Sequence, residues 1–308
     1  MSKKRAILIA GPTASGKSAV ALALAKAIDG AVINADSMQV YQELRVLSAR
    51  PSEQDEAQVS HTLYGFVPAA QAYSVGRWLT DVQRAIAETE ACGKVPIITG
   101  GTGLYFKVLL EGLSPIPDVP EDVREHWRGM AAEMSSEALY AILSERDPDM
   151  AARLELSDTQ RLVRALEVLD ATGASLAQWQ QEAGEAMLKN DEVVRIYITR
   201  PREELYRRIN ARFDTMLEEG ALDEVRALAE LNLGPDLPAM RALGVQPLKD
   251  QISGIITHEE AAEQVKMQTR RYAKRQETWA RSNMITWKSI STQDSESLMS
   301  NIFSFIDV

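Results

Sequence analysis

Residues 11–18 read GPTASGKS, which matches the phosphate-binding pattern G-x-x-x-x-G-K-S at every fixed position. In loops of this kind, successive backbone N–H groups point at phosphate oxygens, and the N-terminus of the following helix adds a partial positive charge. Lys17 would neutralise the outer phosphate, and the Ser18 hydroxyl would bind a Mg²⁺ ion that bridges two phosphates. The predicted phosphate-binding residues are Gly11, Pro12, Thr13, Ala14, Ser15, Gly16, Lys17 and Ser18. The motif leaves open which molecule carries the phosphates, and ATP is the default ligand.

Asp36 is a second residue whose position suggests chemistry. It follows the apolar run at residues 31–35, which predicts a buried strand. Ligands of parallel sheets bind at the carboxyl ends of strands, so Asp36 is expected to face the crevice that the phosphate loop borders. There it is a candidate general base or Mg²⁺ partner. The alternative is an aspartate that caps a following helix, which is a common role for this residue type.

The flanks of the phosphate loop predict the elements that hold it. Residues 6–10 form an apolar run typical of a buried strand, and residues 19–26 are typical of a helix. A third strand is predicted at residues 94–99, and it leads into a second glycine-rich junction at residues 100–105. The commonest ATP hydrolases carry a Mg²⁺-binding aspartate at such a strand end, where this chain has threonine and glycines. Because the sequence also lacks a guanine-reading N-K-x-D tetrapeptide, a motor ATPase or regulatory GTPase is disfavoured.

A basic helix is predicted near the end of the chain. Lys266, Arg270 and Lys274 recur at i, i+4 and i+8, which places them on one face of that helix. The whole chain carries a formal charge of -10 with a pI near 5.0, so any polyanion must bind at a local patch. We therefore predict that this stripe binds nucleic acid or another polyanion, the alternative being a solvated face. Tyr272 and Trp279 lie between the basic residues and either contact bases or belong to the core.

Length and composition indicate a globular protein. The chain has 308 residues, of which 45% are hydrophobic and 25% charged, so it can form a large α/β domain with a smaller inserted or appended one. Cys92 is the single cysteine, which excludes an intrachain disulfide and fits a reducing cytoplasm. The apolar run near the N-terminus is too short for a signal peptide or a membrane span. We expect a soluble, cytoplasmic protein with no membrane partner.

Further local patterns complete the predicted elements. Residues 45–66 are polar and typical of a loop, and apolar positions recur at helical spacing over residues 75–92, which predicts an amphipathic helix with Trp78 in the core. A short last strand is predicted at residues 284–287.

The pattern of elements divides the chain. Prolines at positions 115, 117 and 120 mark a boundary, after which the sequence is typical of helices until a strand pattern returns at residues 193–199. The predicted fold class is α/β, with a P-loop NTPase-like parallel sheet flanked by helices and an inserted all-helical subdomain. The expected boundaries are 1–117 for the first part of the catalytic core, 118–190 for the helical insertion and 191–308 for the second part of the core.

A long helix is predicted after the strand at residues 193–199, and it supplies further cations. It carries Arg207, Arg208 and Arg212, which could reach back to the phosphates. The alternative is a salt-bridged face with Glu203 and Glu204. The sequence alone does not choose between them.

Taken together, these segments make the sequence resemble the bacterial tRNA dimethylallyltransferases, also called isopentenyl-diphosphate:tRNA transferases. The resemblance covers nearly the whole chain. Its carriers are GPTASGKS at 11–18, NADSMQVY at 34–41, ARPS at 49–52, TGGTGLY at 99–105, DTQRLVRALEV at 158–168 and AKRQETWAR at 273–281. Only the first is a general motif, but the combination in this order is highly specific. The chain departs from the family at Arg50, usually lysine, at Ser60 and Thr62, usually proline and a second histidine, and near Val245, where a tyrosine is usual.

The resemblance implies a reaction. Such enzymes move a dimethylallyl group from its diphosphate to the exocyclic amine of the adenosine immediately 3′ of the anticodon, in tRNAs that read codons beginning with U. The phosphate loop would then hold the diphosphate leaving group, helped by Arg208 or Arg212, with Mg²⁺ on Ser18. Asp36 would take the proton of the amine, and Thr102 resembles the substrate-contacting threonine of the family. The expected catalytic residues are Asp36, Lys17, Ser18 and Thr102.

The resemblance also implies a binding surface for the tRNA. The helical insertion would bind the anticodon stem-loop of the tRNA. The protein is expected to be a monomer. The expected tRNA-binding residues are Asp36, Ser37, Met38, Gln39, Thr102, Arg124, Gln160, Arg161, Leu162, Val163, Arg164, Lys274, Arg275, Gln276 and Arg281.

Two other function classes stay open. A P-loop small-molecule kinase also lacks the hydrolase-type aspartate and uses an aspartate after the second strand as its base, but it consumes ATP. An RNA-binding protein that uses the loop only as a nucleotide sensor binds without forming product.

Overall fold

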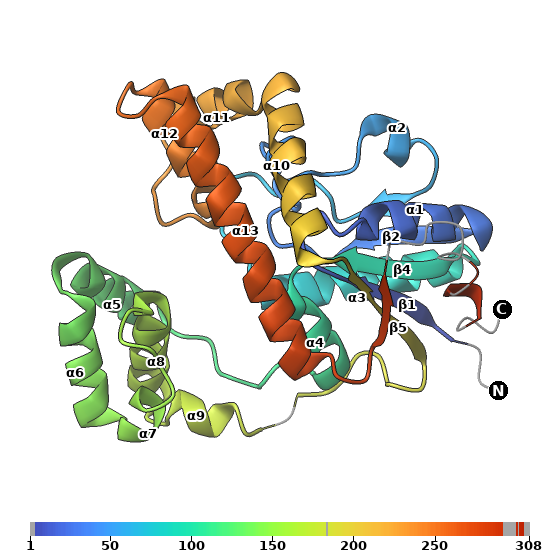
Figure 1. Cartoon of the computed structure of the whole chain (residues 1–308). Coiled ribbons are helices and arrows are strands. Elements are labelled where there is room, and N and C mark those ends of the chain that lie inside the picture. Colours follow the sequence, from blue (N-terminus) through green and yellow to red (C-terminus); the bar gives the residue numbers. More distant parts are fainter. Residues whose placement is uncertain (1–3, 183, 292–299, 301, 305–308) are drawn as a thin grey trace. The chain divides into compact units, whose positions relative to one another are not determined.

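The computed structural model describes residues 4–182, 184–291, 300 and 302–304. Within these residues, six parallel strands form one sheet in the order β3-β2-β4-β1-β5-β6 (Figure 1). The strands are β1 (Ala6–Ala10), β2 (Gly30–Asn34), β3 (His61–Thr62), β4 (Val95–Gly100), β5 (Val193–Thr199) and β6 (Lys288–Ser291). Ala10 pairs with Gly100, and Asn34 pairs with Thr99, so β1, β4 and β2 end side by side. The residues that follow these three strands therefore meet at one edge of the sheet.

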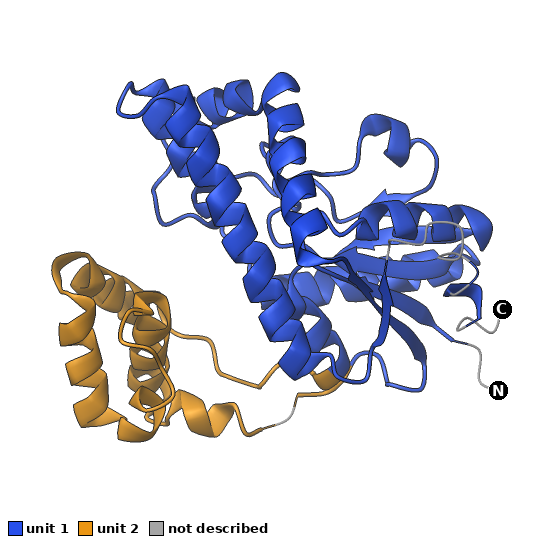
Figure 2. Cartoon of the chain, viewed as in Figure 1, with its two compact units in different colours: residues 1–110, 187–308 blue, residues 111–186 orange. Residues whose placement is uncertain are grey.

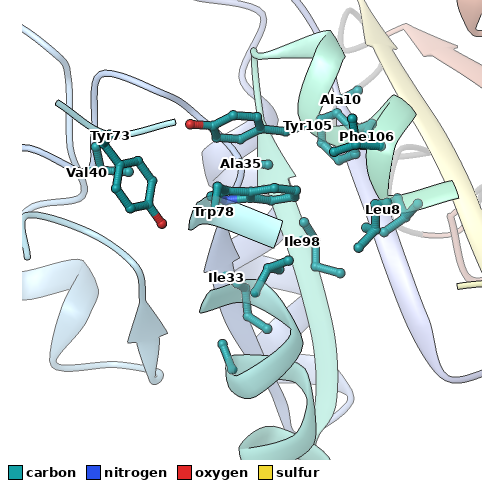
Figure 3. Close-up of a cluster of buried hydrophobic side chains, with 14 of the residues drawn as sticks. Leu8, Ala10, Ile33, Ala35, Val40, Tyr73, Trp78, Ile98, Tyr105 and Phe106 are labelled. Atoms are coloured by element: carbon teal, nitrogen blue, oxygen red, sulfur yellow. The ribbon is translucent and has the colours of Figure 1, made fainter. Parts of the chain in front are cut away.

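Alternating apolar side chains bury both faces of the sheet. Ile7 and Ile9 of β1 pack with helix α1 (Lys17–Ala27) on one face. Leu8 and its neighbours pack on the other face with α3 (Val75–Ala91) and α4 (Gly103–Glu111), as Figure 3 shows. There Trp78 stacks on Tyr105 at 4.2 Å between ring centroids and donates its indole N–H to the carbonyl of Asn34 at 2.9 Å. The predicted sheet with helices on both faces is confirmed.

The other helices around the sheet lie between consecutive strands, α2 between β2 and β3 and the rest between β5 and β6. They are α2 (Glu53–Glu56), α10 (Arg202–Glu218), α11 (Ala221–Glu230), the 3₁₀ helix η1 (Pro238–Arg241), α12 (Val245–Ile252) and α13 (His258–Asn283). Helix α13 contains the predicted basic helix and begins with a capping box between Thr257 and Glu260. It packs against both α10 and α12. Among the described residues, no helix is both long and apolar enough to cross a membrane.

The chain divides into two compact units, residues 1–110 with 187–308, and residues 111–186 (Figure 2). The second unit contains α5 (Glu121–Glu133), α6 (Ser136–Arg146), α7 (Pro148–Ala151), α8 (Thr159–Thr172) and α9 (Leu176–Trp179). Its own core includes Trp127, Leu139 and Leu166. The sequence placed this insertion at 118–190, which is shifted from the compact unit because the prolines lie inside the connecting segment and not at its start.

Two local predictions differ from the structure. A last strand was expected at residues 284–287, but β6 is Lys288–Ser291. The apolar residues that suggested a strand instead form a turn, in which Met284 ends α13 and Trp287 packs edge-on against Phe106. The segment 45–66, expected as a loop, contains α2 and β3, because Ser52 forms a capping box that starts the short helix.

Candidate active site

The phosphate loop has the predicted strand–loop–helix setting. Gly16 adopts a φ of 100°, which glycine accepts readily, and it leads directly into α1 at Lys17. Gly11 lies so close to β5 that a Cβ there would be 2.8 Å from the carbonyl oxygen of Ile198. The backbone N–H of Ser15 donates to the carbonyl of Pro12 at 3.2 Å, which closes the loop. The strand, loop and helix predicted from residues 6–26 are confirmed.

Cationic side chains surround this loop. Arg208 donates from Nε to the Ala14 carbonyl at 3.0 Å, and Arg212 donates to the Thr13 hydroxyl at 2.5 Å. Burial lowers the pKa of Lys17 to about 8, against an opposing effect of the Asp36 charge. Burial likewise lowers the pKa of Arg212 to about 10. Lys17 and Arg212 are half-buried and Arg208 is exposed, and together they form a site suited to a multiply charged anion.

The arginines of α10 were expected either to reach the phosphate loop or to pair with Glu203 and Glu204. For Arg208 and Arg212 the structure favours contact with the loop. Glu204 is paired with Arg200, which follows β5. Arg200 also donates from Nε to the Ser15 carbonyl at 3.4 Å, a loop contact that the sequence analysis missed. The position of Arg200 directly after a strand was the signal that could have found it.

Asp36 lies at the carboxyl end of β2, as expected, and its backbone is held by Asn34. The buried Asn34 side chain accepts a hydrogen bond from the Asp36 N–H at 2.8 Å and donates to the Asp36 carbonyl at 2.9 Å. The Asp36 carboxylate accepts the Met38 N–H at 3.0 Å through Oδ1. The chain forms no helix between Asp36 and α2 (Glu53–Glu56), so Asp36 caps a turn and not a helix. Its Oδ2 lies near the second glycine-rich junction, where a Cβ at Gly101 would be 3.2 Å away.

Thr102 connects that junction to the segment after Asp36. Its hydroxyl oxygen accepts the Ser37 N–H at 3.0 Å, and its own N–H donates to the Ala35 carbonyl at 3.2 Å. Gln39 donates to the carbonyls of Ser48 and Ala49, so its side-chain amide is engaged within the chain. The structure therefore brings Asp36, Thr102 and the phosphate loop to one edge of the sheet.

Gln276 and Trp279 of α13 fit against the second glycine-rich junction. Gln276 accepts the Thr13 N–H at 2.8 Å and donates to the Gly101 carbonyl at 2.9 Å. The Trp279 ring occupies the space where Gly103 would carry a Cβ. The glycines of this junction thus make room for α13, a reason that their pattern in the sequence did not reveal.

The predicted basic stripe on α13 is divided. Lys266 pairs with Asp214 at 2.5 Å, and Arg270 pairs with Glu263 at 3.5 Å, so this half is engaged within the chain. Lys274 and Arg275 are exposed, as is Arg281 one to two turns further on. A groove on this part of the helix is lined by Arg271, Lys274, Arg275, Thr278, Trp279, Ser282 and Asn283. Only the C-terminal half of the stripe offers charge to a polyanion.

In the helical unit, the residues expected to bind tRNA separate into surface and core. Arg124, Arg161 and Arg164 each form an ion pair with an acidic residue three positions away. Gln160 is exposed. Leu162 and Val163, also expected to bind tRNA, have side chains buried in the core of the unit, so only their backbone is available for such a contact. Their apolar side chains form the inner face of the helix that carries the arginines.

Comparison with known proteins gives a consistent set of relatives. The family model described as IPP transferase matches residues 39–283, and the model described as Isopentenyl transferase matches residues 4–64. The tRNA dimethylallyltransferase of Parvibaculum lavamentivorans is 51% identical over 98% of this chain and 96% of its own length. The tRNA dimethylallyltransferase of Rhizobium etli is also 51% identical, over 92% of this chain and 96% of its own.

Solved structures agree. The full-length tRNA isopentenylpyrophosphate transferase from Bacillus halodurans is similar with a TM-score of 0.70 and 32% identity, covering 98% of this chain and 96% of that one. A eukaryotic dimethylallyltransferase acting on tRNA is similar with a TM-score of 0.82 and 27% identity, covering 98% of this chain and 77% of that one. The similarity extends over the sheet and the helical unit alike.

Proposed function

The chain belongs to the IPP transferase family of tRNA dimethylallyltransferases, and we propose on this basis that it transfers a dimethylallyl group from dimethylallyl diphosphate to tRNA. The acceptor is the exocyclic amine of the adenosine immediately 3′ of the anticodon, in tRNAs that read codons beginning with U. The observation that carries the proposal is the meeting of Asp36, Thr102 and the phosphate loop at adjoining strand ends. This arrangement supports a general base and a leaving-group site at the same edge of the sheet.

The loop and its cations would bind the diphosphate and stabilise the charge that it gains as it leaves. When the allylic carbon–oxygen bond breaks, negative charge develops on the diphosphate oxygens. Lys17 and Arg212 are half-buried beside the loop, where they would stabilise this charge together with backbone N–H groups of the loop. Arg208 adds a contact to the loop backbone at Ala14.

Asp36 would accept the proton of the attacking amine. The lone pair of the adenine amine is delocalised into the ring, so the amine is a poor nucleophile until its proton is removed as the new carbon–nitrogen bond forms. The proton becomes acidic as the nitrogen gains positive character, and a positioned carboxylate can then take it. Two hydrogen bonds with the Asn34 side chain hold the Asp36 backbone, and the Met38 N–H donates to Oδ1.

We propose Mg²⁺ as the cofactor, with Ser18 as its protein ligand. The described residues contain no group of three or more His, Cys, Asp or Glu that could enclose a metal ion. Mg²⁺ commonly takes few protein ligands and completes its shell with phosphate oxygens and water, so an exposed serine hydroxyl in the first turn of α1 fits it. The ion would supply charge neutralisation to the diphosphate.

The tRNA would bind through local basic surfaces, since the chain as a whole is acidic. Lys274 and Arg275 on α13, with the surface arginines and Gln160 of the helical unit, support contact with the anticodon stem-loop. The target adenine is stacked and must be extruded to reach Asp36, at a cost of a few kcal/mol. One chain carries all these residues, which supports a monomer, and a tRNA substrate supports a cytoplasmic location.

The test is incubation of the protein with unmodified tRNA, dimethylallyl diphosphate and Mg²⁺, followed by mass spectrometry of the tRNA. We expect the mass gain of one dimethylallyl group, located at the adenosine 3′ of the anticodon. A tRNA with guanosine at that position is the control and should gain nothing. ATP should neither be required nor consumed. Consumption of ATP without prenylation of the tRNA would instead support the alternative of a P-loop small-molecule kinase, which the relatives do not favour.

A further inference from the structure

The Gln276 side chain connects two parts of the active site that the backbone leaves separate. The phosphate loop follows β1, and the second glycine-rich junction follows β4. Gln276 accepts the Thr13 N–H at 2.8 Å and donates to the Gly101 carbonyl at 2.9 Å, and both distances are those of well-formed hydrogen bonds. A single side chain on α13 therefore ties the loop to the neighbouring strand end.

The Gln276 carboxamide carries both the acceptor and the donor that these contacts need. An N–H at Thr13 requires an acceptor, and a carbonyl at Gly101 requires a donor, so the pair also fixes the orientation of the Gln276 amide. A carboxylate offers no donor to Gly101, and an aliphatic side chain offers neither group. Glutamine therefore matches its two backbone partners, whereas a carboxylate or an aliphatic side chain does not.

The contact lies beside the proposed base. A Cβ at Gly101 would overlap Nε2 of Gln276 and would lie 3.2 Å from Oδ2 of Asp36, so all three groups share one small space. On the other side of the junction, Thr102 holds the Ser37 N–H. The phosphate loop, the junction and the segment carrying Asp36 are thus linked in series, and Gln276 is the link nearest the loop.

We propose that Gln276 is a positioning residue. It holds the phosphate loop at Thr13 at a fixed distance from the Asp36 carboxylate, so that the diphosphate and the base are both correctly placed when the dimethylallyl group is transferred. The inference rests on the proposed function. Displacing reacting groups by about 1 Å can lower a rate about a hundredfold, so a link of this kind affects turnover more than binding. Gln276 was expected from the family resemblance to contact tRNA. In the structure its amide forms hydrogen bonds with backbone groups of the chain.

The first test is Gln276→Met, which keeps the length and volume of the side chain and removes both hydrogen bonds. We expect the single-turnover rate constant at saturating substrates to fall about tenfold or more. The dissociation constants for dimethylallyl diphosphate and for tRNA should stay within about threefold of the wild type. Gln264→Met, on the same helix but three turns earlier, is the matched control and should change none of these values.

The second test uses Gly101→Ala, which displaces the Gln276 amide without changing that residue. We expect a loss of rate similar to that of Gln276→Met. In a Gln276→Ala background the slot is empty, so Gly101→Ala should lower the rate further by less than about threefold. Additive losses would mean that the alanine disturbs Asp36 directly and would contradict the link through Gln276.

A third readout does not depend on activity. Hydrogen exchange of residues 11–16 should be faster in Gln276→Met than in the wild type, because the Thr13 N–H loses its acceptor. Unchanged exchange and an unchanged rate would overturn the inference, as would a loss confined to tRNA affinity. If the wild type transfers no dimethylallyl group, the proposed function fails, and exchange at Thr13 still decides whether Gln276 holds the loop.

Discussion

Among single residues, the Asp36 carboxylate is the group whose chemistry the proposed reaction depends on most. We predict that Asp36→Asn lowers the single-turnover rate constant about 10² to 10⁴-fold, because the amide cannot accept the amine proton. Binding of both substrates should persist, which filter binding and calorimetry would measure. Asp29→Asn is the matched control, since Asp29 precedes the same strand that Asp36 follows. An unchanged rate in Asp36→Asn would exclude Asp36 as the base.

Lys17 tests the leaving-group site at the same scale. Removal of one charged donor from a preorganised anion site costs a few kcal/mol of barrier, so Lys17→Ala should lower kcat/KM for dimethylallyl diphosphate about a hundredfold or more. Lys26→Ala, at the other end of α1, is the control and should be close to wild type. Activity of Lys17→Ala near that of the control would refute the phosphate assignment.

At the scale of elements, α13 has two sides with different tasks. Its inner side inserts Gln276 and Trp279 against the glycine-rich junction, while Lys274 and Arg275 remain exposed. The N-terminal basic residues Lys266 and Arg270 pair with acidic groups of the chain. Charge available to the tRNA is therefore concentrated in the turns that also contact the active site.

This division predicts how salt affects tRNA binding. Each lysine that contacts a phosphate releases a counterion, so Lys274→Ala should weaken tRNA binding and reduce the slope of log K against log salt by about 1. The affinity for dimethylallyl diphosphate should not change. Binding titrations at several salt concentrations measure this, with Lys26→Ala as the control. A slope equal to that of the control would remove Lys274 from the tRNA interface.

At the scale of the whole molecule, the two chain segments that flank the helical unit lie side by side within the sheet-containing unit. The N–H groups of Met187 and Leu188 both donate to the Leu109 carbonyl at 3.1 Å. The helical unit also has its own core around Trp127 and Leu166. The two ends of the insertion are therefore close enough for a short linker to join them.

We predict that replacing residues 111–186 with a short Gly/Ser linker leaves the sheet-containing unit folded and able to bind diphosphate, while tRNA affinity falls about tenfold or more. Calorimetry measures the diphosphate binding, circular dichroism the folding, and filter binding the tRNA affinity. If tRNA affinity is retained, the insertion does not grip the anticodon stem-loop; if the shortened chain is unfolded, the two units depend on each other for stability.

The local patterns in this sequence determined much of the fold. The apolar runs of β1, β2 and β5, the amphipathic α3 and the phosphate loop were all placed correctly, because each depends on neighbouring residues along the chain. Hydrophobic periodicity also predicted the burial of Trp78. It misplaced β6, since apolar residues that fill a core from a turn have the same composition as a strand.

The active site divides in the same way. The sequence by itself located the phosphate loop and Asp36, because the loop is a contiguous motif and Asp36 directly follows a strand. Only the tertiary structure decided the partners that come from far along the chain: Gln276 is 263 residues from Thr13 and 175 from Gly101. It likewise decided that Lys266 is paired and that Leu162 is buried. The physical reason is that hydrogen bonds, ion pairs and burial depend on distance in space, which the packing of the helices on the sheet sets.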